Sequence, residues 1–127
     1  MHLHHLAIQV RDLEGTVRWY REILELPLLR EWRDDAGAMR SVWLGLSGEA
    51  FLALERGDGR PRNGGDQAED GPAGYHLAAL RIHPSERQHW EQRLGERGVA
   101  IEHRTRWTVY FRDPEGNRIG LSHHPDE

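Results

Sequence analysis

Histidine, carboxylate, hydroxyl and arginine side chains are the groups with which this sequence can do chemistry. The chain has 127 residues and contains no cysteine and no lysine, so its 17 basic residues are all arginine. This composition excludes a thiolate nucleophile, a thiolate metal site, a disulfide framework and a lysine Schiff base. The nine histidines are therefore the first candidates for a functional site.

Two of the histidines lie where a site residue is expected. His5 belongs to an alternating segment, and His124 follows the last predicted strand on its inward-facing side. We expect most of the others to be solvated, terminal or outward-facing: His2, His4, His83, His89, His103 and His123.

The five tryptophans indicate a second kind of site. Trp19 and Trp90 occupy equivalent positions of two predicted helices and are expected in the core, whereas Trp32, Trp43 and Trp107 lie on predicted strands. Aromatic walls with a few placed polar groups suit a planar or apolar small ligand. The strand tryptophans therefore favour small-molecule binding.

Length and charge set limits on the protein class. The length fits one domain, with residues 1–127 as a single unit. The net charge of −4 leaves no basic field for a nucleic-acid backbone. No apolar run approaches a membrane span and no leader-like segment opens the chain, so we expect a cytoplasmic protein that binds neither nucleic acid nor membrane.

The elements that must position these residues appear twice. Residues 4–10 alternate like a half-buried strand, Asp12 offers an N-cap, and apolar residues then recur at helical spacing until Pro27. Three short strands are predicted at 28–33, 40–46 and 50–55. Residues 56–74, rich in Gly, Pro and charge, are predicted to form a connector. The pattern restarts with a strand at 76–82, a helix at 85–97, and strands at 99–103, 107–112 and 117–122.

The segment FRDPEGN at 111–117 predicts a tight hairpin, because Pro114 fixes its own φ and Gly116 can adopt a left-handed conformation. This segment closely resembles the last hairpin of the glyoxalase/bleomycin-resistance/extradiol-dioxygenase (vicinal oxygen chelate) superfamily. The opening HHLAIQV and RDLEGTVRWYREIL resemble its first strand and helix. The resemblance covers nearly the whole chain and implies an α+β fold. Two β-α-β-β-β modules, 1–55 and 75–127, would form a cup-shaped, mostly antiparallel sheet.

The resemblance also implies where a metal would be held. In such proteins, His and Glu on the first and last strand of each module can bind one divalent cation. His5 matches the first position, but Ala53 and Gly120 stand at the two last-strand positions and offer no donor. For the third position we prefer a register that places Leu77 rather than His76 opposite the site, since Ala78, Leu80 and Ile82 then face the core.

Two function classes follow from these residues. The first is a small-molecule-binding protein without the usual four-ligand metal site and without a cofactor, with a homodimer implied by the family. Its expected ligand-binding residues are His5, Gln9, Trp43, Glu55, Arg81, Trp107 and Ser122. For Arg81 a surface salt bridge is an equal alternative. The second class is a divergent lyase, isomerase or dioxygenase that uses Fe, Mn, Ni or Zn, held by His5, Glu55 and His124.

Overall fold

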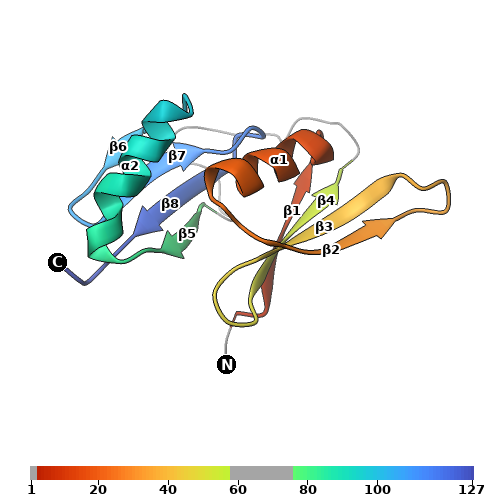
Figure 1. The fold of residues 1–127 in the computed structure, drawn as a ribbon, viewed down its shortest axis with the longest axis horizontal. Coiled ribbons are helices and arrows are strands. Elements are labelled where there is room, and N and C mark those ends of the chain that lie inside the picture. Colours follow the sequence, from red (N-terminus) through yellow and green to blue (C-terminus); the bar gives the residue numbers. More distant parts are fainter. Residues whose placement is uncertain (1–2, 58–75) are drawn as a thin grey trace. The chain divides into compact units, whose positions relative to one another are not determined.

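The computed structural model describes residues 3–57 and 76–127, which form two units of the same topology (Figure 1). Unit 1 comprises Met1–Pro61 and unit 2 comprises Arg62–Glu127. The predicted α+β class with a repeated β-α-β-β-β order is confirmed. The predicted connector at 56–74 lies, from residue 58 onward, outside the described residues. The single domain and the cup shared by both modules stay predictions.

The described part of unit 1 contains one helix and a four-stranded mixed sheet, here called sheet A. Its strands run in the order β1-β4-β3-β2, and β1 is parallel to β4 while the other pairs are antiparallel. The elements are β1 (His5–Val10), α1 (Leu13–Ile23), β2 (Leu28–Arg33), β3 (Met39–Gly45) and β4 (Phe51–Arg56).

The first helix forms where the sequence predicts it and ends earlier. The Asp12 side chain accepts a hydrogen bond from the Gly15 backbone N–H at 3.0 Å, which is the predicted N-cap. Buried Leu13 and Tyr20 lie on one side of α1, which packs on β3 and β4. The helix ends at Ile23, well before Pro27, because Glu25 adopts a left-handed φ of 58°.

Arg56 ties the end of β4 to its neighbours. Its Nε donates to the Met39 carbonyl at 2.9 Å, and its Nη2 donates to the Glu14 carboxylate at 2.6 Å. A backbone hydrogen bond at Glu14 and this Arg56 contact lower the pKa of the Glu14 carboxyl below its usual value.

Unit 2 repeats this plan with shorter elements, in what is here called sheet B. Its strand order is β5-β8-β7-β6, again with the first strand parallel to the last. The elements are β5 (Ala78–Arg81), η1 (Pro84–Glu86), α2 (Arg87–Glu96), β6 (His103–Arg104), β7 (Thr108–Arg112) and β8 (Arg118–Ser122). In the described parts of both units, no helix is long and apolar enough to cross a membrane.

Two predicted elements of unit 2 differ from the structure. The predicted helix begins with a single 3-10 turn, because His83 and Glu86 form a capping box around Pro84. The strand predicted at 99–103 is reduced to His103–Arg104. Its first residue, Val99, instead donates its N–H to the Leu94 carbonyl at 2.9 Å, and Gly98 has a left-handed φ of 72°, as at a helix C-terminus.

The register predicted for β5 is confirmed by its pairing with β8. Ala79 lies opposite Gly120, just as Ala7 lies opposite Ala53 in sheet A. Leu77, two residues before Ala79, is therefore equivalent to His5. A shift by one residue would have put Leu80 and Ile82 on the wrong face.

The hairpin at 111–117 is closed by a buried carboxylate. Asp113 is 4% exposed and accepts hydrogen bonds from the backbone N–H groups of Glu115 and Asn117 at 2.9 and 2.8 Å. Its other oxygen accepts from the Asn117 side chain at 2.8 Å, and Gly116 has a φ of 85°. The predicted turn is thus confirmed, and Asp113 is the residue that holds it.

We predict that Asp113→Ala lowers the free energy of unfolding by about 2 kcal/mol, since two backbone donors of a buried turn lose their acceptor. Asp34→Ala is the matched control, because Asp34 accepts the same pair of backbone bonds, from Ala36 and Ala38 at 2.9 Å, in an exposed turn. Asp34→Ala should lower the free energy of unfolding by only about 0.5 kcal/mol, at the low end for a hydrogen bond. Urea unfolding measures both, and equal losses would contradict the role given to burial.

Candidate functional site: the aromatic and arginine faces

The face of sheet A that does not pack on α1 is rich in rings and is here called the aromatic face. Strand pairing places His5 beside Phe51, Ala7 beside Ala53, and Trp43 beside Ala53 from the other side. Arg30 and Trp32 of β2 continue this face toward the edge of the sheet. The predicted site residues that share it are His5, Gln9, Trp43 and Glu55.

Ring contacts run across all four strands of the aromatic face. Phe51 is stacked between His5, at a centroid distance of 4.8 Å, and Trp43, at 4.3 Å. Trp43 meets Trp32 edge to face at 5.7 Å, and the Arg30 guanidinium lies 3.6 Å from the centre of the Trp32 ring. Phe51 is 7% exposed and Trp32 is 40% exposed. The row thus has a buried ring, Phe51, in its interior and exposed rings, His5 and Trp32, at its two ends.

The polar groups of the aromatic face lie together, where β1, β4 and β3 pair side by side at Gln9, Glu55 and Ser41. Glu55 lies between Gln9 on β1 and Ser41 on β3. The Ser41 hydroxyl oxygen is buried and has no hydrogen-bond partner among the described residues. A buried hydroxyl without a partner is costly, so Ser41 is a polar group that the described residues leave unsatisfied.

The corresponding face of sheet B is basic and is here called the arginine face. By pairing, Arg81 lies beside Ser122, Tyr110 beside Gly120, and Arg112 beside Arg118. Arg81 forms an ion pair with Asp126 and donates to the His124 carbonyl at 3.1 Å, with 64% of its side chain exposed. The surface salt bridge that the sequence left open is therefore present.

Trp107, Ser122 and His124 meet near the end of β8. Trp107 precedes β7 rather than lying on it, and its ring contacts His124 at 4.8 Å. The Trp107 Nε1 is buried without a partner among the described residues. Ser122 accepts a hydrogen bond from the Thr108 hydroxyl at 2.8 Å. These three residues form a cluster in unit 2.

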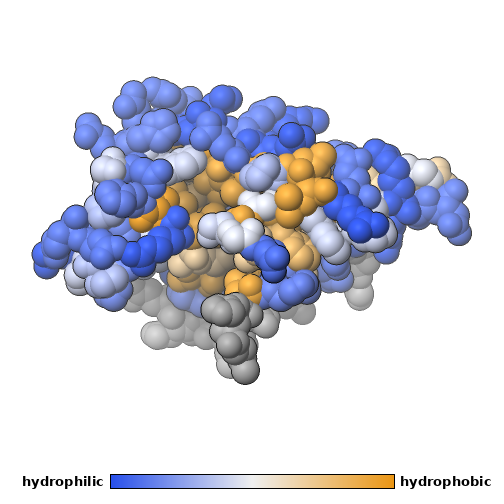
Figure 2. All heavy atoms as spheres, turned by 60° about the horizontal axis from the view of Figure 1, so that its bottom comes forward, coloured by the Kyte–Doolittle hydropathy of each residue, from blue (hydrophilic) through white to orange (hydrophobic). Residues whose placement is uncertain are grey.

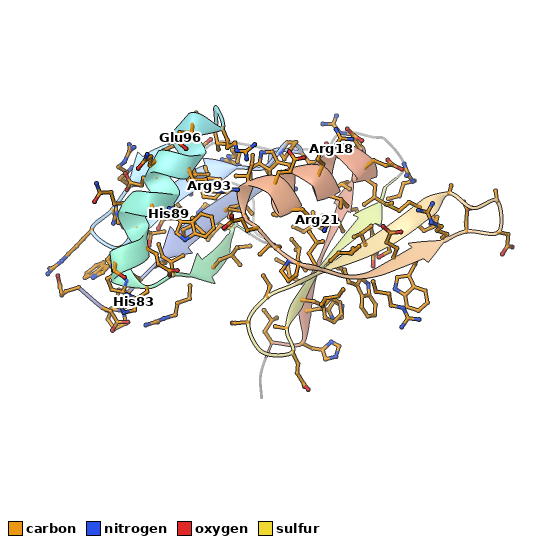
Figure 3. All side chains as sticks on the ribbon, in the orientation of Figure 1. Arg18, Arg21, His83, His89, Arg93 and Glu96 are labelled. Carbon is orange, nitrogen blue, oxygen red and sulfur yellow. The ribbon has the colours of Figure 1, made fainter. Side chains whose placement is uncertain are left out.

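Sequence reasoning missed several residues of these faces: Ser41, Phe51, Tyr110, Arg112 and Arg118. The alternation of FLALE would have identified Phe51, because it lies two residues before Ala53 on the same face. His83 and His89 are exposed on the helical segment of unit 2 (Figure 3), as expected for solvated histidines.

The residues at the implied metal positions do not fit a divalent cation. His5 is a donor, but Ala53, Leu77 and Gly120 have no donor atom. His5 and Glu55 lie four residues apart along the β1–β4 ladder, about 13 Å, and side chains stand perpendicular to a sheet, so the two cannot converge on one ion. Among the described residues, no group of three His, Asp or Glu side chains could hold a metal.

Comparison with known proteins agrees with the topology. The family model described as Glyoxalase/Bleomycin resistance protein/Dioxygenase superfamily matches residues 2–121. The metallothiol transferase FosB of Staphylococcus saprophyticus is 29% identical over 126 residues, which cover 94% of this chain and 74% of that protein.

Two solved structures illustrate the fold. A glyoxalase/dioxygenase from Nostoc punctiforme has a TM-score of 0.78 and 22% identity, covering 98% of this chain and 92% of that one. A mutant of the fosfomycin resistance protein FosX from Listeria monocytogenes, complexed with Mn(II) and 1S,2S-dihydroxypropylphosphonic acid, has a TM-score of 0.72 and 19% identity, covering 95% of this chain and 90% of that one.

We predict that Phe51→Leu lowers the free energy of unfolding by about 1 to 2 kcal/mol, because two ring stacks are lost while an apolar side chain remains. Leu52→Met is the control, because Leu52 is the next residue and is buried on the opposite face. This substitution should lower the free energy of unfolding by less than about 1 kcal/mol. Urea unfolding followed by circular dichroism measures both. Indistinguishable losses would show that the stacks contribute nothing.

Proposed function

Since this chain belongs to the Glyoxalase/Bleomycin resistance protein/Dioxygenase superfamily, we propose that it binds a small planar or apolar molecule on the aromatic face of sheet A. The observation that carries the proposal is the ring row of His5, Phe51, Trp43 and Trp32. In this proposal binding requires neither a metal nor another cofactor.

The ring row supplies a preformed apolar surface. Phe51 is held between two rings, so Trp43 is stacked on a fixed partner and loses little freedom when a ligand covers it. Trp32 is partly exposed, and the flat Arg30 guanidinium already stacks on its ring. A flat ligand would stack on a tryptophan ring in the same way. Such a surface favours a flat ligand over a flexible polar one.

The polar end of the same face gives the ligand an orientation. The buried hydroxyl of Ser41 lies in the ladder beside Glu55, which in turn lies beside Gln9. A ligand that covers Trp43 and carries one hydrogen-bonding group could satisfy Ser41. A few placed polar groups in an apolar site are the usual source of specificity.

The donor set supports metal-independent binding. Ala53, Leu77 and Gly120 cannot coordinate an ion, and His5 stacks on Phe51 and contacts the His4 ring nitrogen at 2.8 Å. The relatives named above include a metallothiol transferase and a Mn(II) complex. A divergent lyase, isomerase or dioxygenase that uses Fe, Mn, Ni or Zn is therefore the alternative that an experiment must separate.

We predict that 2-naphthol, a neutral planar probe, binds the wild type and that Trp43→Ala weakens its binding by about 1 to 3 kcal/mol, the range for a lost stack. Trp90→Ala is the matched control, because Trp90 is a half-buried tryptophan of α2 outside the aromatic face. Calorimetry with and without EDTA should give the same affinity. The His5→Ala variant should keep most of the wild-type affinity for 2-naphthol.

Two results would contradict this proposal. Equal binding by the wild type and Trp43→Ala would remove the aromatic face as the site. Loss of binding in EDTA, restored by Fe, Mn, Ni or Zn, would instead support the metal-dependent alternative.

The proposed functional form is a homodimer formed through the edge of sheet A. Apolar side chains are exposed among charged ones on the face seen in Figure 2. The large exposed apolar residues of the described part are Leu3, Leu28, Leu29 and Trp32, and three of these four lie on the edge strand β2. An exposed apolar edge strand is a surface that proteins normally cover.

We predict that Leu29→Glu shifts the protein from dimer to monomer in sedimentation velocity. Leu29 is 55% exposed on β2. Leu3→Glu is the control, because Leu3 is 65% exposed but lies before β1, and it should leave the dimer unchanged. A monomeric wild type at all concentrations would contradict the proposal.

A further inference from the structure

Two guanidinium groups share one carboxylate on the arginine face. The Arg112 Nε donates to Glu102 at 3.0 Å, whereas the Arg118 Nε lies 4.0 Å from the other Glu102 oxygen, which is too long for a hydrogen bond. Glu102 can neutralise only one of the two. This cluster of two guanidinium groups and one carboxylate therefore carries a net positive charge.

Arg118, the more weakly paired of the two, lies in a mostly buried position. Only 16% of its side chain is exposed, and its Nε is buried without a hydrogen-bond partner in the described part of the chain. Its Nη1 lies 2.8 Å from the His76 Nε2, which must accept because a guanidinium can only donate. A neutral imidazole accepts a hydrogen bond from one Arg118 N–H group but does not offset the positive charge of the guanidinium. A buried charge that a distant, shared carboxylate only partly offsets is costly.

The Tyr110 ring also supports the Arg118 guanidinium. Its central carbon lies 4.6 Å from the centre of the Tyr110 ring. A Cβ atom added to Gly120 would lie 3.5 Å from two carbons of the same ring, so the ring packs closely on the Gly120 backbone. Arg118 is thus held by this stack and by only a long ion pair with Glu102, and most of its donors keep no acceptor among the described residues.

We propose that Arg118 is the centre of an oxyanion subsite on the arginine face, which binds a carboxylate or phosphate group of a ligand. A planar guanidinium presents two parallel N–H groups that match such an anion, and the anion would supply the missing negative charge. His76, which lies beside Nη1, would border the bound group. This subsite is argued from unit 2 alone and does not require ligand binding on the aromatic face.

Anion binding by the full-length protein tests the subsite. Titration calorimetry with inorganic phosphate and, separately, with acetate at constant chloride should show saturable binding of at least one. The stronger of the two identifies the preferred group. Arg118→Met should raise the dissociation constant about tenfold or more, as for a lost charge-assisted hydrogen bond. Arg104→Met is the control, because Arg104 is exposed and paired with Glu91 at 3.3 Å, and it should change nothing.

A second variant should strengthen binding, which misfolding cannot imitate. Glu102→Gln removes the carboxylate that competes for both arginines and should lower the dissociation constant severalfold. Glu91→Gln, which removes the partner of Arg87 and Arg104 elsewhere in unit 2, should leave it unchanged. The subsite is overturned if neither anion binds, or if Arg118→Met and Glu102→Gln both keep the wild-type affinity. Binding of 2-naphthol is measured independently, so either proposal can fail alone.

Discussion

The parallel ladder between the first and last strand of each unit is the constraint on which the rest depends. It places Ala7 opposite Ala53 in sheet A and Ala79 opposite Gly120 in sheet B. Because side chains alternate between the two faces of a strand, these pairings decide which residues face the core and which face away. The aromatic face and the arginine face are both consequences of this register.

The same ladder carries different chemistry in the two units. Sheet A holds rings across its strands, with Phe51 as the shared contact. Sheet B holds arginines, with Tyr110 as the support for Arg118. Both sets occupy the faces on which the superfamily resemblance implies metal ligands. At Ala53, Leu77 and Gly120, where the resemblance implies metal ligands, these faces carry no donor atom, and rings and arginines surround those positions.

Much of the fold could be predicted from the sequence because local signals agree with one another. Alternation predicted β1, Asp12 marked the start of α1, and FRDPEGN marked the last hairpin. Helix ends were less predictable, since the left-handed Glu25 and the bond from Val99 to Leu94 are decided by local backbone geometry. Parity predicted one shared face for His5, Gln9, Trp43 and Glu55, and the strand pairing places them on one face of sheet A. That these residues bind a ligand stays a prediction. The pairing of Arg112 and Arg118 with one Glu102 depends on side-chain geometry that no spacing rule predicts.

The contact between Trp32 and Trp43 has an optical consequence. Two indole rings with centroids 5.7 Å apart and planes 60° apart are close enough for their electronic transitions to couple. Coupled transitions of this kind give a paired positive and negative band in circular dichroism, which isolated tryptophans do not. The protein thus contains an intrinsic chromophore pair in sheet A, and its signal reports the geometry of the aromatic face without any added label.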